Sequence, residues 1–318
     1  MKQCLYCYKP LLNDEIDFHA ACSRKIFGSD VVPELPYTDD EMQDLATEII
    51  RSQISVTGVQ AKLSLEISAS KPKENKRFTI VGLWGAFILK PQTTTYVHLP
   101  EVEDLTMHLA EIAKIRTVPH SLIRLKSGTL AYITKRLDRK GRDKIQMEDM
   151  CQLTERMTEH KYHSSYENIA KTVLRYSINP VLDEIVFYEQ IVFSFLTGNA
   201  DMHLKNFSLL RTSTAGFTLM PAYDMVATVL VNPADKEELA LTLNGKKRKL
   251  KKSDFQEAFA LNGLDEKSIE HVFSKFGQAI PLWFEFIQLS FLPEAMKAEY
   301  VDLIAERAKR LEIESFFC

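Results

Sequence analysis

The residues with the clearest chemical potential lie in one short segment, Gly198 to Asn206 (GNADMHLKN). Asp201 and Asn206 have the D-x4-N spacing of phosphoryl-transfer loops, in which the aspartate accepts a proton from the attacking hydroxyl and the asparagine binds magnesium. Asp224 follows the strand-like segment 217–220, and its carboxylate could complete a magnesium site. The pattern indicates transfer of a phosphoryl group from ATP, although aspartate and asparagine are also common caps in loops.

A second set of candidates, in the first half of the chain, could bind the nucleotide. Lys90 ends the apolar segment 86–90, and Glu103 lies 13 residues later on a predicted helix, where it could orient the lysine by an ion pair. Residues 55–62 (SVTGVQAK) form a loop of small residues whose backbone N–H groups could surround phosphates. The alternatives are two exposed charges and a plain hairpin turn.

The elements that must position these residues differ between the two halves of the chain. In the first half, alternating or β-rich segments predict strands at 62–68, 77–83, 86–90, 122–128 and 130–137. Helical spacing occurs at 41–53, 101–115, 166–176, 181–198, 254–264, 269–290 and 293–313. Gly198 is expected to end the apolar helix that precedes the catalytic segment.

These elements predict an α+β fold with two lobes. We expect a small N-terminal segment at 1–40, a β-rich N-lobe with the phosphate-binding loop at 41–140, and an all-helical C-lobe with the catalytic loop at 141–318. A β-rich half joined near 136–146 to a helical half is one way to build a cleft for ATP.

Composition argues against several other classes of protein. The 318 residues carry a net charge of −3, which does not favour a general nucleic-acid binder, so no direct DNA binding is expected. No apolar run of about 18 residues occurs, and the N-terminus lacks the basic and apolar parts of a signal peptide, so we expect no membrane span. Five cysteines in a chain of this length do not suggest a disulfide framework, and we expect a cytoplasmic location.

Four residues near the N-terminus have the types and spacing of a metal site. The pattern Cys4-x2-Cys7-x11-His19-x2-Cys22 gives two close pairs of soft ligands, which suits a tetrahedral structural zinc. The alternative is three small buried cysteines and a surface histidine. Trp84 and Trp283 are both expected in the core, and the basic run 246–252 is expected to be a solvated loop.

Six segments of the chain occur in a characteristic order: SVTGVQAKLSL (55–65), FILKP (87–91), ITKRLDR (133–139), MEDMCQL (147–153), GNADMHLKNFS (198–208) and PAYDM (221–225). In this combination they resemble the HipA family of serine/threonine kinase toxins. The resemblance runs from about residue 50 to residue 260 and implies a protein-kinase-like fold.

The resemblance also implies a role for each matching residue. Asp201 corresponds to the catalytic base, with Lys205 and His203 as supporting catalytic groups, and Asn206 and Asp224 correspond to the magnesium ligands. The implied ATP-binding positions are Ser55, Val56, Thr57, Gly58, Lys62, Lys90, Lys135, Leu137 and Asp138. Of these, Lys135 to Leu137 match the hinge that meets the adenine.

Regulation and partners are implied in the same way. The family autophosphorylates a serine that corresponds to Ser55, and its shorter HipT branch has two hydroxyl residues in this loop, so Thr57 is a second candidate. Only 54 residues precede Ser55, which resembles the short branch, where the N-terminal domain is a separate small protein. Family substrates include aminoacyl-tRNA synthetases, and partners include a helix-turn-helix antitoxin, HipB. The competing hypotheses are a catalytically silent binding module and a small-molecule kinase.

Overall fold

The computed structural model describes residues 2–12, 14–52, 60–68, 76–81, 84–141, 143–213 and 216–313. The predicted phosphate-loop residues Ser55, Val56, Thr57 and Gly58 lie outside these ranges. The chain divides into two compact units, each described here by itself: Met1–Asp104 with Val118–Lys144, and Leu105–Thr117 with Ile145–Cys318. The N-terminal segment 1–40 therefore belongs to the same unit as the β-rich part.

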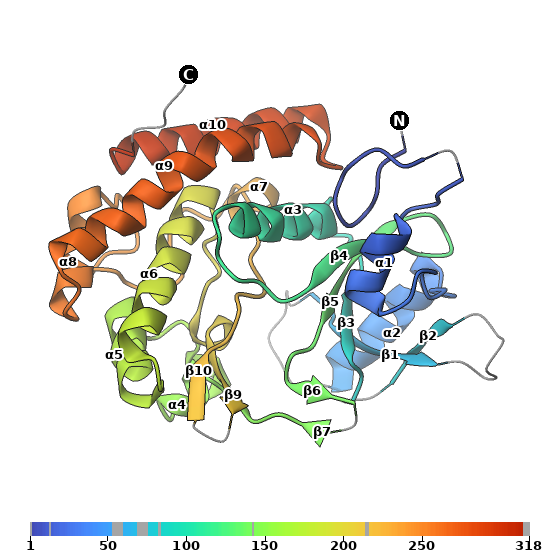
Figure 1. Ribbon diagram of the computed structural model, residues 1–318, viewed down its shortest axis with the longest axis horizontal. Helices are drawn as coiled ribbons and strands as arrows, with labels where there is room; N and C mark the ends of the chain where they lie inside the picture. Colours follow the sequence, from blue (N-terminus) through green and yellow to red (C-terminus); the bar gives the residue numbers. More distant parts are fainter. Residues whose placement is uncertain are drawn as a thin grey trace. The chain divides into compact units, whose positions relative to one another are not determined.

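The first unit is built on a five-stranded antiparallel sheet with the strand order β2-β1-β3-β5-β4 (Figure 1). The strands are β1 (Leu63–Ser68), β2 (Arg77–Ile80), β3 (Phe87–Lys90), β4 (His120–Arg124) and β5 (Leu130–Lys135). The other elements that begin in this unit are α1 (Ala20–Phe27), α2 (Asp39–Ser52), α3 (Leu99–Ile112), β6 (Arg139–Lys140) and β7 (Asp143–Lys144). All five predicted strands and the hairpin near Gly128 are present. The first positions of β1 alternate between buried and half-buried, whereas β4 and β5 are each buried at four consecutive positions.

Aromatic side chains join α1 to the sheet. Phe27, at the end of α1, lies edge-on to Phe78 of β2 at 5.7 Å between ring centroids, and Phe78 lies edge-on to Phe87 of β3 at 5.6 Å. All three rings are buried. Edge-to-face contacts of this kind add to the free energy gained from apolar burial, so α1 is anchored to the sheet by its last residue.

Trp84 was wrongly predicted to lie in the core. Its side chain is 65% exposed, and the guanidinium of Arg139 lies 5.1 Å from the centre of its ring. Trp84 sits in the turn before β3 rather than within a strand, so the pleat does not direct its side chain inward.

The second unit contains most of the helices. They are α4 (Met150–Leu153), α5 (Tyr166–Tyr176), α6 (Pro180–Thr197), α7 (Thr228–Val231), α8 (Lys252–Leu261), α9 (Glu266–Gln288) and α10 (Glu294–Arg310). Helices α6, α9 and α10 pack against one another (Figure 1). As predicted, Trp283 of α9 is fully buried. Its ring lies edge-on to Phe193 of α6 at 5.5 Å, and its indole N–H donates to the Leu109 carbonyl at 2.8 Å.

The prediction of an all-helical second half is wrong, because this unit also contains a three-stranded antiparallel sheet, β10-β9-β8. Its strands are β8 (Met147–Asp149), β9 (Ser208–Ser213) and β10 (Gly216–Leu219), and two 3-10 turns lie nearby, Thr158–His160 and Leu204–Asn206. β8 pairs with β9, with Asp149 opposite Ser208. Such pairing between distant segments leaves no local periodic pattern in a three-residue strand.

Among the helices of the described residues, none combines the length and the apolar composition that a membrane-spanning helix needs.

Candidate functional site

The candidate segment Gly198 to Asn206 begins at the C-terminal end of helix α6. Helix α6 ends at Gly198, as predicted, and Gly198 has the left-handed backbone conformation with φ +74°. A β-carbon at this position would lie 2.7 Å from Cδ2 of Leu303, which is closer than such atoms can pack. Glycine fits this position because it adopts the left-handed backbone conformation without strain and has no β-carbon to collide with Leu303. The helix end therefore fixes the direction in which the following residues leave α6.

Asp201 and Asn206 are in direct contact. The side-chain amide Nδ2 of Asn206 donates to the main-chain carbonyl of Asp201 at 3.0 Å, so its Oδ1 remains as the acceptor of that amide. The loop between α6 and this contact is held at its backbone: the Asp201 N–H donates to Asn199 Oδ1 at 3.2 Å, and the Ala200 N–H donates to Thr228 Oγ1 at 2.9 Å. The D-x4-N spacing thus folds the two residues onto each other.

Tyr162 is a site residue that the sequence did not reveal. Its phenol donates to Asp201 Oδ1 at 2.5 Å. Burial, and then the negative charge of Asp201, raise the pKa of Tyr162 well above its ordinary value, so the phenol stays a hydrogen-bond donor at neutral pH. Tyr162 is 39 residues from Asp201 in the chain, and its polar surroundings in EHKYHSS resemble any exposed turn.

His203 lies beside this contact and is almost completely buried, at 6% exposure. Its ring is edge-on to Tyr162 at 5.0 Å. Burial lowers the pKa of His203 to about 4, while the charges of Asp201 and Asp224 oppose the shift only in part. Both carboxylates therefore act on one imidazole, and that imidazole is neutral at pH 7.

A neutral buried histidine makes the stability of the fold depend on pH. The pKa of His203 is about 4 in the folded protein and near 6.5 when exposed, so between these values the unfolded chain binds the extra proton. The free energy of unfolding is therefore unaffected by this histidine above pH 6.5 and falls as the pH is lowered toward 4. Over this range we expect the free energy of unfolding of wild type to fall by up to roughly 3 kcal/mol more than that of His203→Gln. Urea unfolding at a series of pH values would measure this difference, and parallel pH dependences of the two proteins would contradict the expectation.

Lys205 is held by a residue that was not predicted to belong to the site. Its ammonium donates to Asp149 Oδ2 at 2.9 Å, at the end of β8. Asp149 also caps helix α4, where its side chain accepts the backbone N–H of Gln152. The pairing of β8 with β9 therefore supplies the carboxylate that orients Lys205.

Asp224 stands in a strained backbone conformation. Its φ is +56°, a left-handed value that costs a non-glycine residue on the order of 1 kcal/mol. The preceding residues are fixed: the Ala222 N–H donates to the Arg116 carbonyl at 2.8 Å, and the Tyr223 phenol donates to the Lys205 carbonyl at 2.9 Å. PAYDM is thereby hydrogen-bonded to the segment 198–206.

In the first unit, the predicted ion pair between Lys90 and Glu103 is present. The ammonium of Lys90, 3% exposed, donates to Oε1 of Glu103, which is fully buried, and lies 5.3 Å from the centre of the Tyr132 ring. The alternative of two ordinary exposed charges is therefore wrong. A buried lysine keeps its charge only with such a partner. Lys62, the residue directly before β1, is exposed.

The residues of the predicted hinge lie at the end of β5 and directly after it. Lys135 is exposed and its backbone N–H donates to the Pro119 carbonyl at 2.8 Å, while Leu137 and Asp138 are half-buried. Both carboxylate oxygens of Asp138 accept from Arg136, at 2.9 and 2.7 Å. Burial raises the pKa of Asp138, but the Arg136 guanidinium outweighs it, and the pKa lies below its ordinary value. Asp138 is thus an ionised partner of Arg136.

The four N-terminal candidates, named here the cysteine–histidine cluster, come together in the first unit. One ligand atom of each lies within 4.8 Å of all the others: Cys4 Sγ, Cys7 Sγ, Cys22 Sγ and one imidazole nitrogen of His19. Cys4 and Cys22 are buried, whereas Cys7 and His19 are half-buried. The spacing therefore predicted a real spatial cluster.

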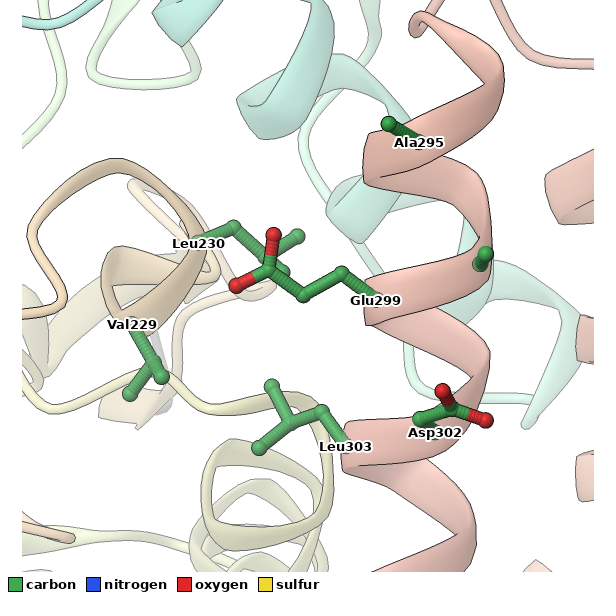
Figure 2. Close-up of a pocket in the computed structure, with 7 residues that line it drawn as sticks. Val229, Leu230, Ala295, Glu299, Asp302 and Leu303 are labelled. Carbon is green, nitrogen blue, oxygen red and sulfur yellow. The ribbon is translucent and has the colours of Figure 1, made fainter.

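One pocket of the second unit is lined by none of the candidate catalytic residues of that unit, although two of its lining residues, Val229 and Leu303, lie next to Gly198. It has a volume of about 500 Å³ and lies between α7 and α10 (Figure 2). Its lining is mostly apolar with two carboxylates: Val229, Leu230, Ala295, Ala298, Glu299, Asp302 and Leu303. Because it contains none of the candidate catalytic residues, we assign it no part in the chemistry.

A family model covers most of this chain. The model of the HipA-like C-terminal domain matches residues 54–284. A presumed kinase from Haemophilus influenzae is 26% identical over 246 residues, which cover 71% of this chain and 68% of the relative. A presumed kinase from Sinorhizobium fredii, Y4dM, is 28% identical over 258 residues, which cover 76% of this chain and 60% of the relative. The chain thus spans about two thirds of the length of these relatives, or less.

Two solved structures share the fold. HipA, in its complex with HipB and operator DNA from Shewanella oneidensis, matches with a TM-score of 0.68 and 21% identity, over 82% of this chain and 66% of that chain. The Helicobacter pylori proinflammatory kinase CtkA matches with a TM-score of 0.53 and 15% identity, over 72% of this chain and 89% of that chain. At these identities the likeness establishes the fold alone.

Proposed function

Because the chain belongs to the HipA-like C-terminal domain family, we propose that it is an ATP-dependent serine/threonine protein kinase of a toxin–antitoxin system. The observation that carries the proposal is the joined arrangement of the catalytic segment and PAYDM in the second unit. There the Asn206 amide bonds to the Asp201 carbonyl, and Tyr223 bonds to the Lys205 carbonyl. The carboxylates of Asp201 and Asp224 act on the same buried histidine.

The oxygen donors present suit magnesium. The amide oxygen of Asn206 and the carboxylate of Asp224 are hard ligands of the kind that Mg²⁺ prefers. The amide nitrogen of Asn206 already donates to the Asp201 carbonyl, so the orientation of its oxygen is fixed. When bound, Mg²⁺ would neutralise charge on the transferring phosphates. We assign Asn206 and Asp224 to this metal.

We assign the remaining residues to proton transfer and to ATP binding. Asp201 accepts the proton of the attacking hydroxyl, and its carboxylate is held for this by Tyr162. Lys90, oriented by Glu103, binds ATP phosphates, as Lys205 does with Asp149 as its partner. We further assign Lys62 and the loop of Ser55, Val56, Thr57 and Gly58 to the phosphates, and Lys135 to Leu137 with the following Asp138 to the adenine.

The substrate and partners are proposed from the family. We propose a protein substrate, with an aminoacyl-tRNA synthetase as the first candidate, and autophosphorylation at Ser55, Thr57 or both. HipA from Shewanella oneidensis forms a complex with HipB and operator DNA. By analogy, we propose a HipB-like antitoxin and a separate small protein as partners in the cytoplasm, following the short HipT-like architecture, with no direct DNA contact by this chain.

Intact mass spectrometry with and without Mg-ATP tests the proposal. Wild type is expected to gain the mass of one or more phosphoryl groups in the peptide that contains Ser55 and Thr57. Asp224→Asn is expected to slow this gain by roughly 10²–10³-fold, because the metal loses its charged ligand. Equal gains in both proteins would contradict the site assignment. If ATP raises the melting temperature of wild type but no protein is phosphorylated, the chain is a binding module.

A further inference from the structure

The cysteine–histidine cluster is assembled from two local structures of the first unit. Cys4 and Cys7 lie on a tight turn that is closed by two backbone hydrogen bonds, from the Tyr8 N–H to the Cys4 carbonyl and from the Cys4 N–H to the Lys9 carbonyl, each 2.9 Å. Tyr8 ends this turn with a left-handed φ of +61°. The turn presents two sulfur atoms on one side, as a C-x2-C ligand pair must.

The second pair comes from the beginning of helix α1. His19 is the residue before the helix, and Cys22 lies in its first turn, with the Cys22 N–H donating to the His19 carbonyl at 2.9 Å. The i, i+3 spacing places both side chains on the same face of the helix start. Two rigid pairs, one on a turn and one on a helix, thus converge on one point.

The orientation of the His19 ring decides which nitrogen faces the sulfur atoms. Nε2 lies 3.0 Å from the Pro10 carbonyl, which can only accept a hydrogen bond, so Nε2 carries the proton. Nδ1 of the neutral ring is then left with its lone pair directed at the cluster, 3.4 Å from Cys7 Sγ and 3.7 Å from Cys22 Sγ. Metal-binding histidines are fixed by this type of second hydrogen bond.

These distances match a tetrahedral site. Zinc bonds of about 2.3 Å to sulfur and about 2.1 Å to nitrogen separate the two ligand atoms by roughly 3.6 Å. We propose that the cysteine–histidine cluster binds one structural Zn²⁺ through the three cysteine sulfurs and His19 Nδ1. Binding releases the three thiol protons, and all four coordination positions belong to the protein, so the site is structural rather than catalytic.

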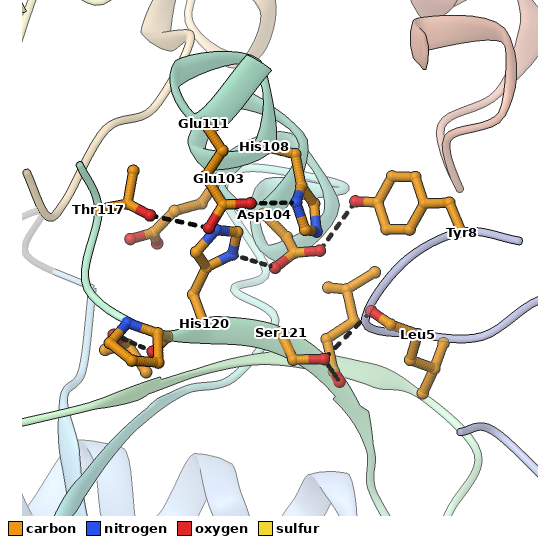
Figure 3. Close-up of polar contacts among 12 residues, drawn as sticks. Leu5, Tyr8, Glu103, Asp104, His108, Glu111, Thr117, His120 and Ser121 are labelled. Carbon is orange, nitrogen blue, oxygen red and sulfur yellow. Dashed lines mark hydrogen bonds and ion pairs between the residues drawn. The ribbon is translucent and has the colours of Figure 1, made fainter. Parts of the chain in front are cut away.

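The proposed zinc has a definite mechanical consequence, because the ligand turn is docked on the sheet and on α3. Figure 3 shows the Tyr8 phenol donating to Asp104 Oδ2, at 2.8 Å, and His120 Nδ1 bonded to the other oxygen of Asp104, also at 2.8 Å. The Ser121 hydroxyl donates to the Leu5 carbonyl at 3.1 Å. Asp104 directly follows Glu103, the partner of Lys90. The zinc would therefore stabilise the turn of Cys4 and Cys7, and this turn holds Asp104 of α3 through Tyr8.

Metal analysis of the whole protein tests the proposal. Protein purified without chelator is expected to contain about one zinc per chain, and Co²⁺ exchanged into the site should give the intense near-ultraviolet absorption of thiolate–cobalt bonds. Cys4→Ser and Cys22→Ser are expected to lower the zinc content at least tenfold. Cys151→Ser is the matched control, since Cys151 is also buried but lies on α4, outside the cluster.

Three further variants keep the test decisive if the serine variants fail to fold. His19→Cys should retain zinc, because it supplies a fourth sulfur ligand, whereas His19→Ala should lose it. Tyr8→Phe should retain zinc but lower the melting temperature, because the hydrogen bond to Asp104 is removed while the four ligands stay in place. Absence of zinc and of a cobalt spectrum in wild type, or a disulfide within the cluster in freshly purified protein, would overturn the proposal. Zinc content does not depend on the kinase proposal, so Asp201→Asn should contain as much zinc as wild type.

Discussion

Replacement of Asp201 by asparagine is expected to lower the rate of phosphate transfer by roughly 10²–10⁴-fold. The amide has almost the same shape as the carboxylate and its oxygen can still accept the Tyr162 hydrogen bond, but it cannot take up the proton of the attacking hydroxyl. The backbone bond from the Asn206 amide to residue 201 is unaffected by the substitution. Single-turnover transfer from labelled ATP, at saturating Mg-ATP, would measure the loss.

Tyr162→Phe provides the matched control for this experiment. It removes the phenol that holds Asp201 but keeps the base, so the expected loss is about tenfold or less, the value of one hydrogen bond. Both variants should keep the wild-type circular dichroism and the ATP-dependent rise in melting temperature. A rate for Asp201→Asn within a few fold of wild type would exclude Asp201 as the base.

Glu103→Gln is expected to destabilise the protein by roughly 3–5 kcal/mol, because the buried Lys90 ammonium then loses the negative charge of the Glu103 carboxylate. The double variant Lys90→Met with Glu103→Leu removes both charges and replaces them with apolar side chains of similar length. Its stability is expected to return to near the wild-type value. Chemical denaturation of the wild type, the single variants Lys90→Met and Glu103→Leu, and the double variant would give the coupling energy.

The same double variant separates stability from function. It is expected to fold but to transfer no phosphate, because the ammonium proposed to bind ATP phosphates is gone. A refolded double variant with wild-type activity would show that Lys90 has a structural role only. If the double variant instead loses as much stability as the sum of the two single variants, the Lys90–Glu103 contact contributes little.

Several features of the site could be predicted because they depend on short-range spacing. The contact of Asp201 with Asn206 lies within one loop, and Gly198 directly ends the helix before it. Each ligand pair of the cysteine–histidine cluster lies within one turn of the chain, Cys4 with Cys7 and His19 with Cys22. Lys90 and Glu103 were predictable as a pair because a strand and the following helix bring residues 13 positions apart together. In each case the backbone geometry of one or two elements already fixes the neighbours.

Other features were decided only by the tertiary structure. Tyr162 reaches Asp201 across 39 residues, and Asp149 reaches Lys205 across 56, through the pairing of β8 with β9. The exposure of Trp84 and the burial that keeps His203 neutral likewise depend on what packs around them. The sequence by itself therefore determined which residues are the candidates for phosphate transfer. The tertiary structure determined which partners hold them, because contacts between distant segments follow from packing of the whole unit and leave no periodic pattern in the chain.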